Sequence, residues 1–305
     1  MHILLTGATG HTGRHFLSTL LAEGHRVTAV QRTDTRALPG PDLGPDRLRW
    51  VRQDLAQGTK ALPADYDAVI HAAAHAPPRA DNATAHVAHN VIATRNLVEH
   101  AARRAGRRMI FLSSISVYGR VSAPVVDEAT ASHSPGSYGL SKLLGEQLLA
   151  ETGDRLASVS LRLPGIVGTS AEGPWLSCAL ADLQAGRPVR LHSPECPFNN
   201  FIAIEDLCPF LGRLLSLLRP GHDVLTLAPG EPLPLRTALE HLADSAGLSA
   251  RLIEQPAPRP AFTISPERAV KHYGYIPRSV RAALGRLGAA VRRHEAGALI
   301  APLNL

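Results

Sequence analysis

Short apolar segments typical of buried strands alternate with helical segments through the first two-thirds of the sequence. The expected strands span residues 2–6, 26–30, 48–53, 68–74, 109–114 and 157–164, and the expected helices span 14–24, 90–104 and 138–151. Buried strands joined by helices form right-handed βαβ units, whose strands run parallel and are covered on both faces. The alternation therefore predicts an α/β fold with a doubly wound parallel sheet.

The sequence beyond Pro164 is less regular, which indicates a second structural part. Its expected elements are a helix at 175–186, a strand entering a helix at 201–218, a strand at 223–230, and helices at 266–275 and 279–293. We expect residues 1–165 and 201–230 to form the main domain. Residues 166–200 and 231–305 are expected to form a smaller C-terminal lobe.

The formal net charge of +6 raises the question of a nucleic-acid partner. The densest basic run, RRAGRR at 103–108, has no interleaved aromatic residues and follows an expected helix. Because the helix dipole favours arginine at a helix C-terminus, a structural role explains the run and we expect no nucleic-acid binding. No apolar run approaches the roughly 18 residues of a membrane span, so we expect a cytoplasmic protein without a membrane partner.

Cysteine and histidine are too scattered to indicate a disulfide framework or a metal site. Cys178, Cys196 and Cys208 are odd in number and lack CxxC spacing. His86 and His89 lie at helical spacing, but the sequence offers no third ligand to accompany them. We therefore expect no metal.

The segment TGATGHTGR at 6–14 joins the first expected strand to the first expected helix. Gly7 permits a tight turn, Gly10 allows a pyrophosphate to approach the backbone, and Gly13 allows the helix to pack on the strand. The helix N-terminus and the backbone amides of this turn form an anion site. Its GxxGxxG spacing, which differs from GxGxxG, predicts a dinucleotide site.

Tyr138 and Lys142 are four residues apart in SYGLSKLLGEQLL, so they share one face of the expected helix. A nearby ammonium favours the phenolate and lowers the pKa of a tyrosine, which brings the phenol toward proton exchange at neutral pH. Ser114 ends the preceding expected strand, in FLSSISVYG. These three residues are the candidate catalytic group.

These motifs together resemble a known enzyme family. The similar segments are TGATGHTGR, HAAA at 71–74, SSISVYG at 113–119, Tyr138 with Lys142, RLPGIVG at 162–168, NNFIAIEDL at 199–207, residues 227–247 and PERAVKHYGYIP at 266–277. In this order they resemble the extended short-chain dehydrogenase/reductase family, of the NAD(P)-dependent epimerase/dehydratase type. The resemblance spans nearly the whole chain and implies a Rossmann domain with a substrate-binding C-terminal lobe.

The resemblance also implies roles for individual residues. Ser114 would hydrogen-bond the reacting oxygen, Tyr138 would transfer the proton, and Lys142 would lower the Tyr138 pKa and hold the nicotinamide ribose. Asp54 would lie near the adenine, and Asn90 would support the sheet near the active site. With the glycine segment, the implied cofactor-binding residues are Gly7, Ala8, Thr9, Gly10, His11, Thr12, Gly13, Gln31, Arg32, Asp54, Leu55, Ala72, Ala73, Ala74, Asn90, Ser113, Tyr138, Lys142, Leu163 and Pro164.

The end of the second expected strand bears on the choice of cofactor. Enzymes of this fold that use NAD place an acidic residue on the ribose 2′-hydroxyl, whereas an arginine accommodates the 2′-phosphate of NADP. Here the strand ends with Gln31 and Arg32, and Asp34 lies slightly late. We expect NADP to be preferred over NAD.

Two substitutions within the motifs narrow the reaction that the resemblance implies. Related dehydratases carry an Asp–Glu pair directly after the catalytic hydroxyl residue, where this chain has Ile115 and Ser116. Many nucleotide-sugar members carry an arginine that binds the diphosphate, where this chain has Asn199. Dehydration is therefore disfavoured and the case for a nucleotide sugar is weakened, with Arg187 or Arg190 as the alternative diphosphate ligands.

Three functional hypotheses remain. The favoured one is an NADPH-dependent ketoreductase acting on a keto-sugar linked to a nucleotide or on another small ketone. The enzymatic alternative is an NAD-dependent nucleotide-sugar 4-epimerase, and the alternative of another class is a nucleotide-sensing protein without turnover. By resemblance we also expect a homodimer, paired through the helices near Asn90 and Tyr138.

Overall fold

The computed structural model describes residues 1–33, 46–76, 82–104, 106–169, 173–257 and 260–300, with side chains up to Arg293. Asp34 and the proline-rich loop at 39–45 lie outside this range. The chain divides into two compact units. Unit 1 contains residues 1–120, 131–163 and 207–226, and unit 2 contains residues 121–130, 164–206 and the described part of 227–305.

Unit 1 is built on seven parallel strands in the order β12-β7-β5-β4-β1-β2-β3. The strands are β1 (His2–Thr6), β2 (Arg26–Gln31), β3 (Leu48–Arg52), β4 (Ala68–His71), β5 (Arg108–Ser114), β7 (Ala157–Leu163) and β12 (Gly221–Thr226). Their order reverses between β1 and β4, which is the switch point of a doubly wound sheet. The predicted Rossmann-type α/β fold is confirmed.

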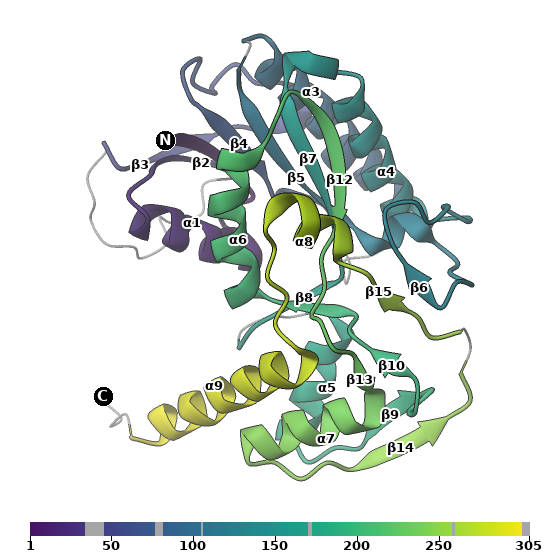
Figure 1. Ribbon diagram of the computed structural model, residues 1–305. Helices are drawn as coiled ribbons and strands as arrows, with labels where there is room; N and C mark the ends of the chain where they lie inside the picture. The colour runs from purple at the N-terminus through teal and green to yellow at the C-terminus, as the bar shows by residue number, and fades with distance from the viewer. Residues whose placement is uncertain (34–45, 77–81, 105, 170–172, 258–259, 301–305) are drawn as a thin grey trace. The chain divides into compact units, whose positions relative to one another are not determined.

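Helices cover both faces of this sheet (Figure 1). One side carries α1 (His11–Ala22) and α6 (Ile204–Leu217), whose residues from Leu207 onward belong to unit 1. The other side carries α3 (Ala93–Ala102) and α4 (Ser137–Ala150). In α1 the buried residues Phe16, Leu17, Leu20 and Leu21 recur at helical spacing, which gives the helix the apolar stripe that packs on the strands.

The helix before β5 begins earlier than the sequence indicates and changes its winding. It consists of α2 (Ala83–His86), a π-helical segment η2 (Val87–Ile92) and α3. The Asn82 side chain accepts a hydrogen bond from the Ala85 amide and caps the start of α2. π-Helical turns are rare and often occur at functional sites, and this one contains the buried Asn90.

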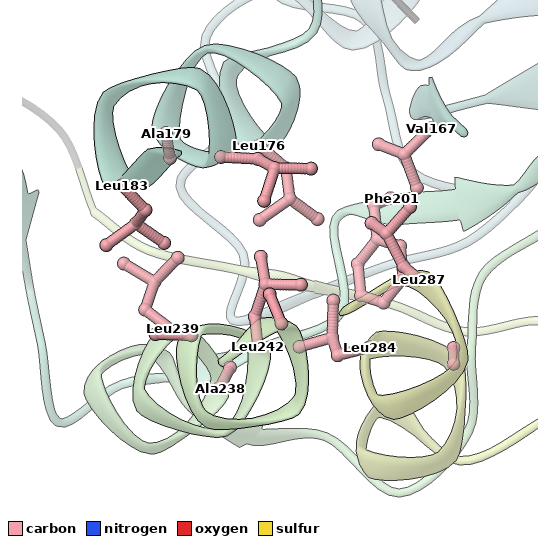
Figure 2. Close-up of a cluster of buried hydrophobic side chains, with 14 of the residues drawn as sticks. Val167, Leu176, Ala179, Leu183, Phe201, Ala238, Leu239, Leu242, Leu284 and Leu287 are labelled. Carbon is pink, nitrogen blue, oxygen red and sulfur yellow. The ribbon is translucent and has the colours of Figure 1, made fainter. Parts of the chain in front are cut away.

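Unit 2 has its own hydrophobic core, formed by α5 (Trp175–Gln184), α7 (Leu235–Ala246) and α9 (Val280–Ile300). Leucine and alanine side chains from the three helices point toward one another, with Val167 and Phe201 beside them (Figure 2). Helix α7 was not anticipated from the sequence pattern, although its buried leucines, Leu235, Leu239 and Leu242, recur every three or four residues.

Pairs of short strands complete unit 2. They are β8 (Gly165–Val167) with β11 (Phe201–Ala203), β9 (Val189–His192) with β14 (Leu252–Gln255), β10 (Pro197–Phe198) with β13 (Leu233–Pro234), and β6 (Val125–Val126) with β15 (Thr263–Ile264). The pairing of β6 with β15 explains a difference from the sequence expectation: residues 121–130, expected in the main domain, belong to unit 2. The remaining helical segments are η1 (Leu55–Gln57), η3 (Ile115–Tyr118), η4 (Gly153–Arg155) and α8 (Glu267–Tyr273).

Neither a membrane-spanning helix nor a metal-binding cluster is found among the described residues. In that part of the chain no helix is long and apolar enough to cross a membrane. Within the same ranges, no three or more His, Cys, Asp or Glu side chains are grouped so that they could hold a metal ion.

Candidate active site

The turn between β1 and α1 can be made only by glycine at two positions. Gly7 has φ +72°, and a Cβ added there would lie 2.6 Å from the Ala73 amide nitrogen. A Cβ at Gly13 would lie 2.0 Å from the Gly7 carbonyl oxygen. The chain therefore turns tightly and α1 starts directly against it, which leaves the free amides of a helix N-terminus facing the end of β1.

A cavity of about 310 Å³ lies beside this turn, at the carboxyl ends of β1, β2 and β4. This is the switch point where doubly wound folds bind nucleotides. The predicted cofactor residues that line it are Gly7, Thr9, Gly10, Gln31, Arg32, Asp54, Leu55, Ala72, Ala73 and Ala74. The lining also includes residues that the sequence analysis missed, namely Thr6, Val30, Thr33, Gln53, His75, His89 and Ala93. Most of these additional lining residues could have been found from the sequence, because they lie within two residues of a strand end or of a predicted cofactor residue.

The other predicted cofactor residues do not line this cavity. Ala8 is buried under the turn, and His11, Thr12 and Gly13 form the first turn of α1. Leu163 ends β7, and Pro164 is the first residue of the next segment, which belongs to unit 2.

Asn90 and Ser113 are held in contacts with other protein groups. The Asn90 side chain accepts a hydrogen bond from the His75 amide and donates to the His75 carbonyl and to the Ser141 hydroxyl. It thereby fixes the segment after β4, which lines the cavity. The Ser113 hydroxyl donates to Glu146 instead of pointing to the cavity residues.

The buried His71 side chain also fixes the strand ends beside the cavity. Its two ring nitrogens are hydrogen-bonded to the hydroxyls of Thr6 and Thr94, at 2.7 and 2.9 Å. Burial, aided by the charge of Lys142, lowers the pKa of His71 to about 3, so the ring is neutral at physiological pH. A neutral imidazole can accept at one nitrogen and donate at the other, and it therefore links the ends of β1 and β4 to α3.

Arg32 and Asp54, which carry opposite charges, both line the cavity close to His89. Burial and the neighbouring Arg32 guanidinium lower the pKa of His89, while Asp54 acts in the opposite direction. Asp54 also caps η1 by accepting a hydrogen bond from the Ala56 amide. Arg32 therefore lines the cavity as predicted, close to Asp54 and His89.

The fold brings the three candidate catalytic residues together. Ser114 at the end of β5 lies close enough to the Tyr138 hydroxyl to affect its pKa. The Ser114 hydroxyl donates to Ser116 Oγ, and its oxygen accepts from the Ser116 amide, both at 3.1 Å. Lys142 is 2% exposed, and its Nζ donates to the Leu112 carbonyl oxygen at 2.7 Å. The same Nζ lies 5.9 Å from the centre of the Tyr138 ring.

The electrostatics of this group differ from the sequence expectation. Burial raises the pKa of Tyr138 to about 12, although the hydrogen bond with Ser114 acts in the opposite direction. Burial also lowers the pKa of Lys142 to about 7, and Glu146 opposes that shift. The lowered Tyr138 pKa expected from the sequence is not met in this structure, because burial outweighs the hydrogen bond with Ser114 and the Lys142 Nζ is directed to the Leu112 carbonyl. The neutral phenol that results is the form that donates a proton.

Asn199 has a structural role that the sequence does not indicate. It is buried, its Nδ2 donates to the carbonyls of Pro229 and Ile264, and its Oδ1 accepts from the Ile264 amide. All of its principal hydrogen-bonding groups are thus used to tie three segments of unit 2 together. Of the alternative diphosphate ligands, Arg187 is paired with Asp182 at 2.7 Å on the surface, and Arg190 is exposed on β9.

Comparison with known proteins agrees with this geometry. Residues 3–224 match the sequence model of the NAD dependent epimerase/dehydratase family. The chain is similar to D-erythronate dehydrogenase of Cupriavidus necator, with 33% identity over 220 residues, which cover 65% of this chain and 67% of that protein. It is also similar to 4-hydroxy-2-methyl-3-oxo-4-farnesyl-3,4-dihydroquinoline-1-oxide ketoreductase of Stigmatella aurantiaca, with 28% identity over 260 residues, 83% of this chain and 75% of that protein.

A solved structure extends the similarity to both units. MoeE5 in complex with UDP-glucuronic acid and NAD has a TM-score of 0.77 and 25% sequence identity, and the match covers 96% of this chain and 100% of that chain.

Proposed function

Because the chain belongs to the NAD-dependent epimerase/dehydratase family and is therefore an NAD(P)-dependent enzyme, we propose that it is an NADPH-dependent ketoreductase. The observation that carries the proposal is the contact of Ser114 with Tyr138, next to a buried Lys142, beside the glycine-lined cavity. The reacting ketone is a small molecule, either a keto-sugar or another ketone.

Each residue of the site has a distinct task in this reaction. The bound nicotinamide supplies the hydride. Tyr138, protonated because its pKa is raised, donates its proton to the carbonyl oxygen as negative charge develops there. The Ser114 hydroxyl supports the same oxygen, and the Lys142 ammonium holds the nicotinamide ribose.

The choice of a ketone over a nucleotide sugar draws on the position of Asn199. Its side chain is committed to backbone groups at Pro229 and Ile264 and so does not replace a diphosphate-binding arginine. The Stigmatella relative is a ketoreductase, which is in line with this choice.

The alternative within the family is a 4-epimerase, which keeps NAD bound and uses it twice. The MoeE5 complex with NAD and UDP-glucuronic acid favours it as second candidate. Mass spectrometry of gently purified protein separates the two, because an epimerase should retain NAD whereas a reductase exchanges its cofactor. A nucleotide-sensing protein would bind the nucleotide but would convert no substrate.

The test of the proposal is NADPH oxidation, followed at 340 nm, against a panel of alkyl, aromatic and sugar ketones. We expect at least one class to be reduced with release of NADP. Tightly bound NAD together with interconversion of nucleotide sugars would replace the proposal by the epimerase. Tight NADPH binding without turnover of any carbonyl would replace it by the sensor.

Arg32→Ala tests the preference for NADP. Arg32 lines the cavity but is exposed, so its charge-assisted bond to the 2′-phosphate should contribute about 1.5 kcal/mol, at the lower end for such bonds. The dissociation constant for NADPH should rise about tenfold while that for NADH hardly changes, as measured by fluorescence titration. Arg49→Ala, which removes an exposed arginine of β3 outside the cavity, is the matched control. Equal losses for both cofactors in the Arg32 variant would contradict the assignment.

We further propose a homodimer paired through the helices α3 and α4. On α4, Leu140 and Leu144 lie one turn apart and are 49% and 43% exposed. Multi-angle light scattering at micromolar concentration should give twice the chain mass of 32.5 kDa. The double change Leu140→Glu and Leu144→Glu should produce the monomer, whereas Ile276→Glu, at a 75% exposed position of unit 2, should not. A wild-type monomer would refute the dimer.

A further inference from the structure

Glu146 lies on α4 one helical turn beyond Lys142 and two turns beyond Tyr138. Only 5% of its surface is exposed. A carboxylate removed from water in this way is costly unless charged or hydrogen-bonding partners surround it.

Two neighbouring strands supply the partners of Glu146. The Ser113 hydroxyl donates to Glu146 Oε1. The Arg162 guanidinium donates through Nε to Oε1 at 3.1 Å and through Nη2 to Oε2 at 2.8 Å. Ser113 on β5 and Arg162 on β7 are direct partners in the sheet register. Glu146 therefore anchors α4 at one point on the sheet, beside Ser114.

This anchor joins the two elements that carry the catalytic residues. Ser114 follows Ser113 directly on β5, and Tyr138 and Lys142 precede Glu146 on the same face of α4. Loss of the anchor would free the helix from the strand end and disturb the contact between Ser114 and Tyr138.

The groups around Lys142 indicate a second role for Glu146, which is to favour the charged form of the Lys142 amine. From β4, His71 is neutral because its pKa is about 3. On α4, Tyr138 is protonated because its pKa is about 12. From β5, Lys142 faces the Leu112 carbonyl and the Phe111 ring, whose centre is 4.7 Å from Nζ.

The more distant groups complete this environment. Arg162 on β7 is a cation, whose Nη1 donates to the Tyr118 hydroxyl from η3 at 3.3 Å. His222 on β12 is hydrogen-bonded to Ser158 and Ser160, and burial lowers its pKa. Besides the Leu112 carbonyl and the Phe111 ring, the Glu146 carboxylate thus favours the charged form of Lys142, and it does so with an opposite charge.

We propose that Glu146 is a positioning residue of the active site, which fixes α4 on the ends of β5 and β7 and whose carboxylate favours the charged form of Lys142. The inference rests on the proposed function for the catalytic meaning of Lys142, but the anchor and the charge can be measured without any substrate. Glu146 depends on Arg162 for this role, because the Arg162 guanidinium holds the Glu146 carboxylate in place.

The scarcity of lysine allows a direct measurement. The sequence contains three lysines, Lys60, Lys142 and Lys271, so a protein labelled with ¹³C at lysine Cε gives three resolvable NMR signals. In the wild type the Lys142 signal should titrate near pH 7. In Glu146→Gln its midpoint should fall by about one unit or more, because an opposite charge that favoured the ammonium has been removed.

Three further variants separate the effect of the Glu146 charge from the effect of its packing contacts. Glu146→Asp keeps the charge, so the Lys142 midpoint should stay closer to the wild type than in Glu146→Gln, although the shortened side chain weakens the anchor. Glu151→Gln removes an exposed carboxylate just beyond α4 and should leave the midpoint unchanged. If Glu146→Gln does not fold, the double change Glu146→Gln with Arg162→Gln avoids an unpaired buried guanidinium, and it should still lower the midpoint.

A Lys142 midpoint unchanged in the folded Glu146→Gln protein, or in the double variant, overturns the proposal. If a ketone substrate is found, the alkaline limb of the kcat/KM profile should also move to lower pH in Glu146→Gln, because Lys142 loses its proton earlier. If no ketone is reduced by the wild type, the proposed function fails while the NMR titration still decides the role of Glu146.

Discussion

Tyr138→Phe is expected to lower ketone turnover by about 10²–10⁴, the usual contribution of a general acid. The change keeps the ring and its packing but removes the hydroxyl that is hydrogen-bonded to Ser114. Because the hydroxyl donates its proton only during the reaction, the dissociation constant for NADPH should hardly change. The measurements are steady-state NADPH oxidation and fluorescence titration of the cofactor.

A matched control is available in unit 2. Tyr273→Phe, at the end of α8, removes a hydroxyl with no assigned part in the chemistry and should leave kcat unchanged. Wild-type turnover in Tyr138→Phe would show that another group protonates the substrate. A large loss of NADPH affinity in the same variant would instead show that the hydroxyl serves binding.

Gly13→Ala should strongly weaken nucleotide binding. The added Cβ would lie 2.0 Å from the Gly7 carbonyl oxygen, and because the obstacle is backbone, α1 must move away from the turn. Overpacking of this kind costs about 1–3 kcal/mol of stability and sometimes more. NADPH affinity should fall at least about 100-fold, as the amides of the turn and helix no longer converge on the phosphates.

The measurement must separate a damaged site from a damaged fold. Binding is therefore titrated at a temperature where circular dichroism shows the variant to be folded, and stability is taken from urea unfolding. Gly136→Ala is the control, because a Cβ at Gly136 meets no atom within 4 Å, and it should keep both properties near the wild type. NADPH binding at wild-type strength by Gly13→Ala would disprove the role of the glycine turn.

Features decided by local sequence could be predicted without the structure. The alternating apolar segments of unit 1 fixed the parallel sheet, because a buried strand and an amphipathic helix each carry their own periodicity. The glycine turn was readable because its three glycines lie within seven residues and the atoms that crowd Gly13 belong to the turn itself, although those that crowd Gly7 belong to Ala72 and Ala73. The spacing of Tyr138 and Lys142 placed both on one face of α4 for the same reason.

Features decided by packing between distant segments could not be read in this way. Asn199 looks like a replaced ligand in the sequence, yet its partners are the backbone at Pro229 and Ile264. The pairing of β6 with β15, which places 121–130 in unit 2, joins segments more than a hundred residues apart. No local pattern specifies such pairings.

The pKa values of the site show most clearly which features the local sequence determines and which the tertiary structure determines. The amino-acid sequence by itself determined that a tyrosine and a lysine share a helical face and that a serine ends the neighbouring strand. Only the tertiary structure decided that burial raises the pKa of Tyr138 and lowers that of Lys142, and that Glu146 opposes the second shift. Desolvation depends on everything that surrounds a group, and those surroundings come from β4, β5 and β7, which meet α4 only in the folded chain.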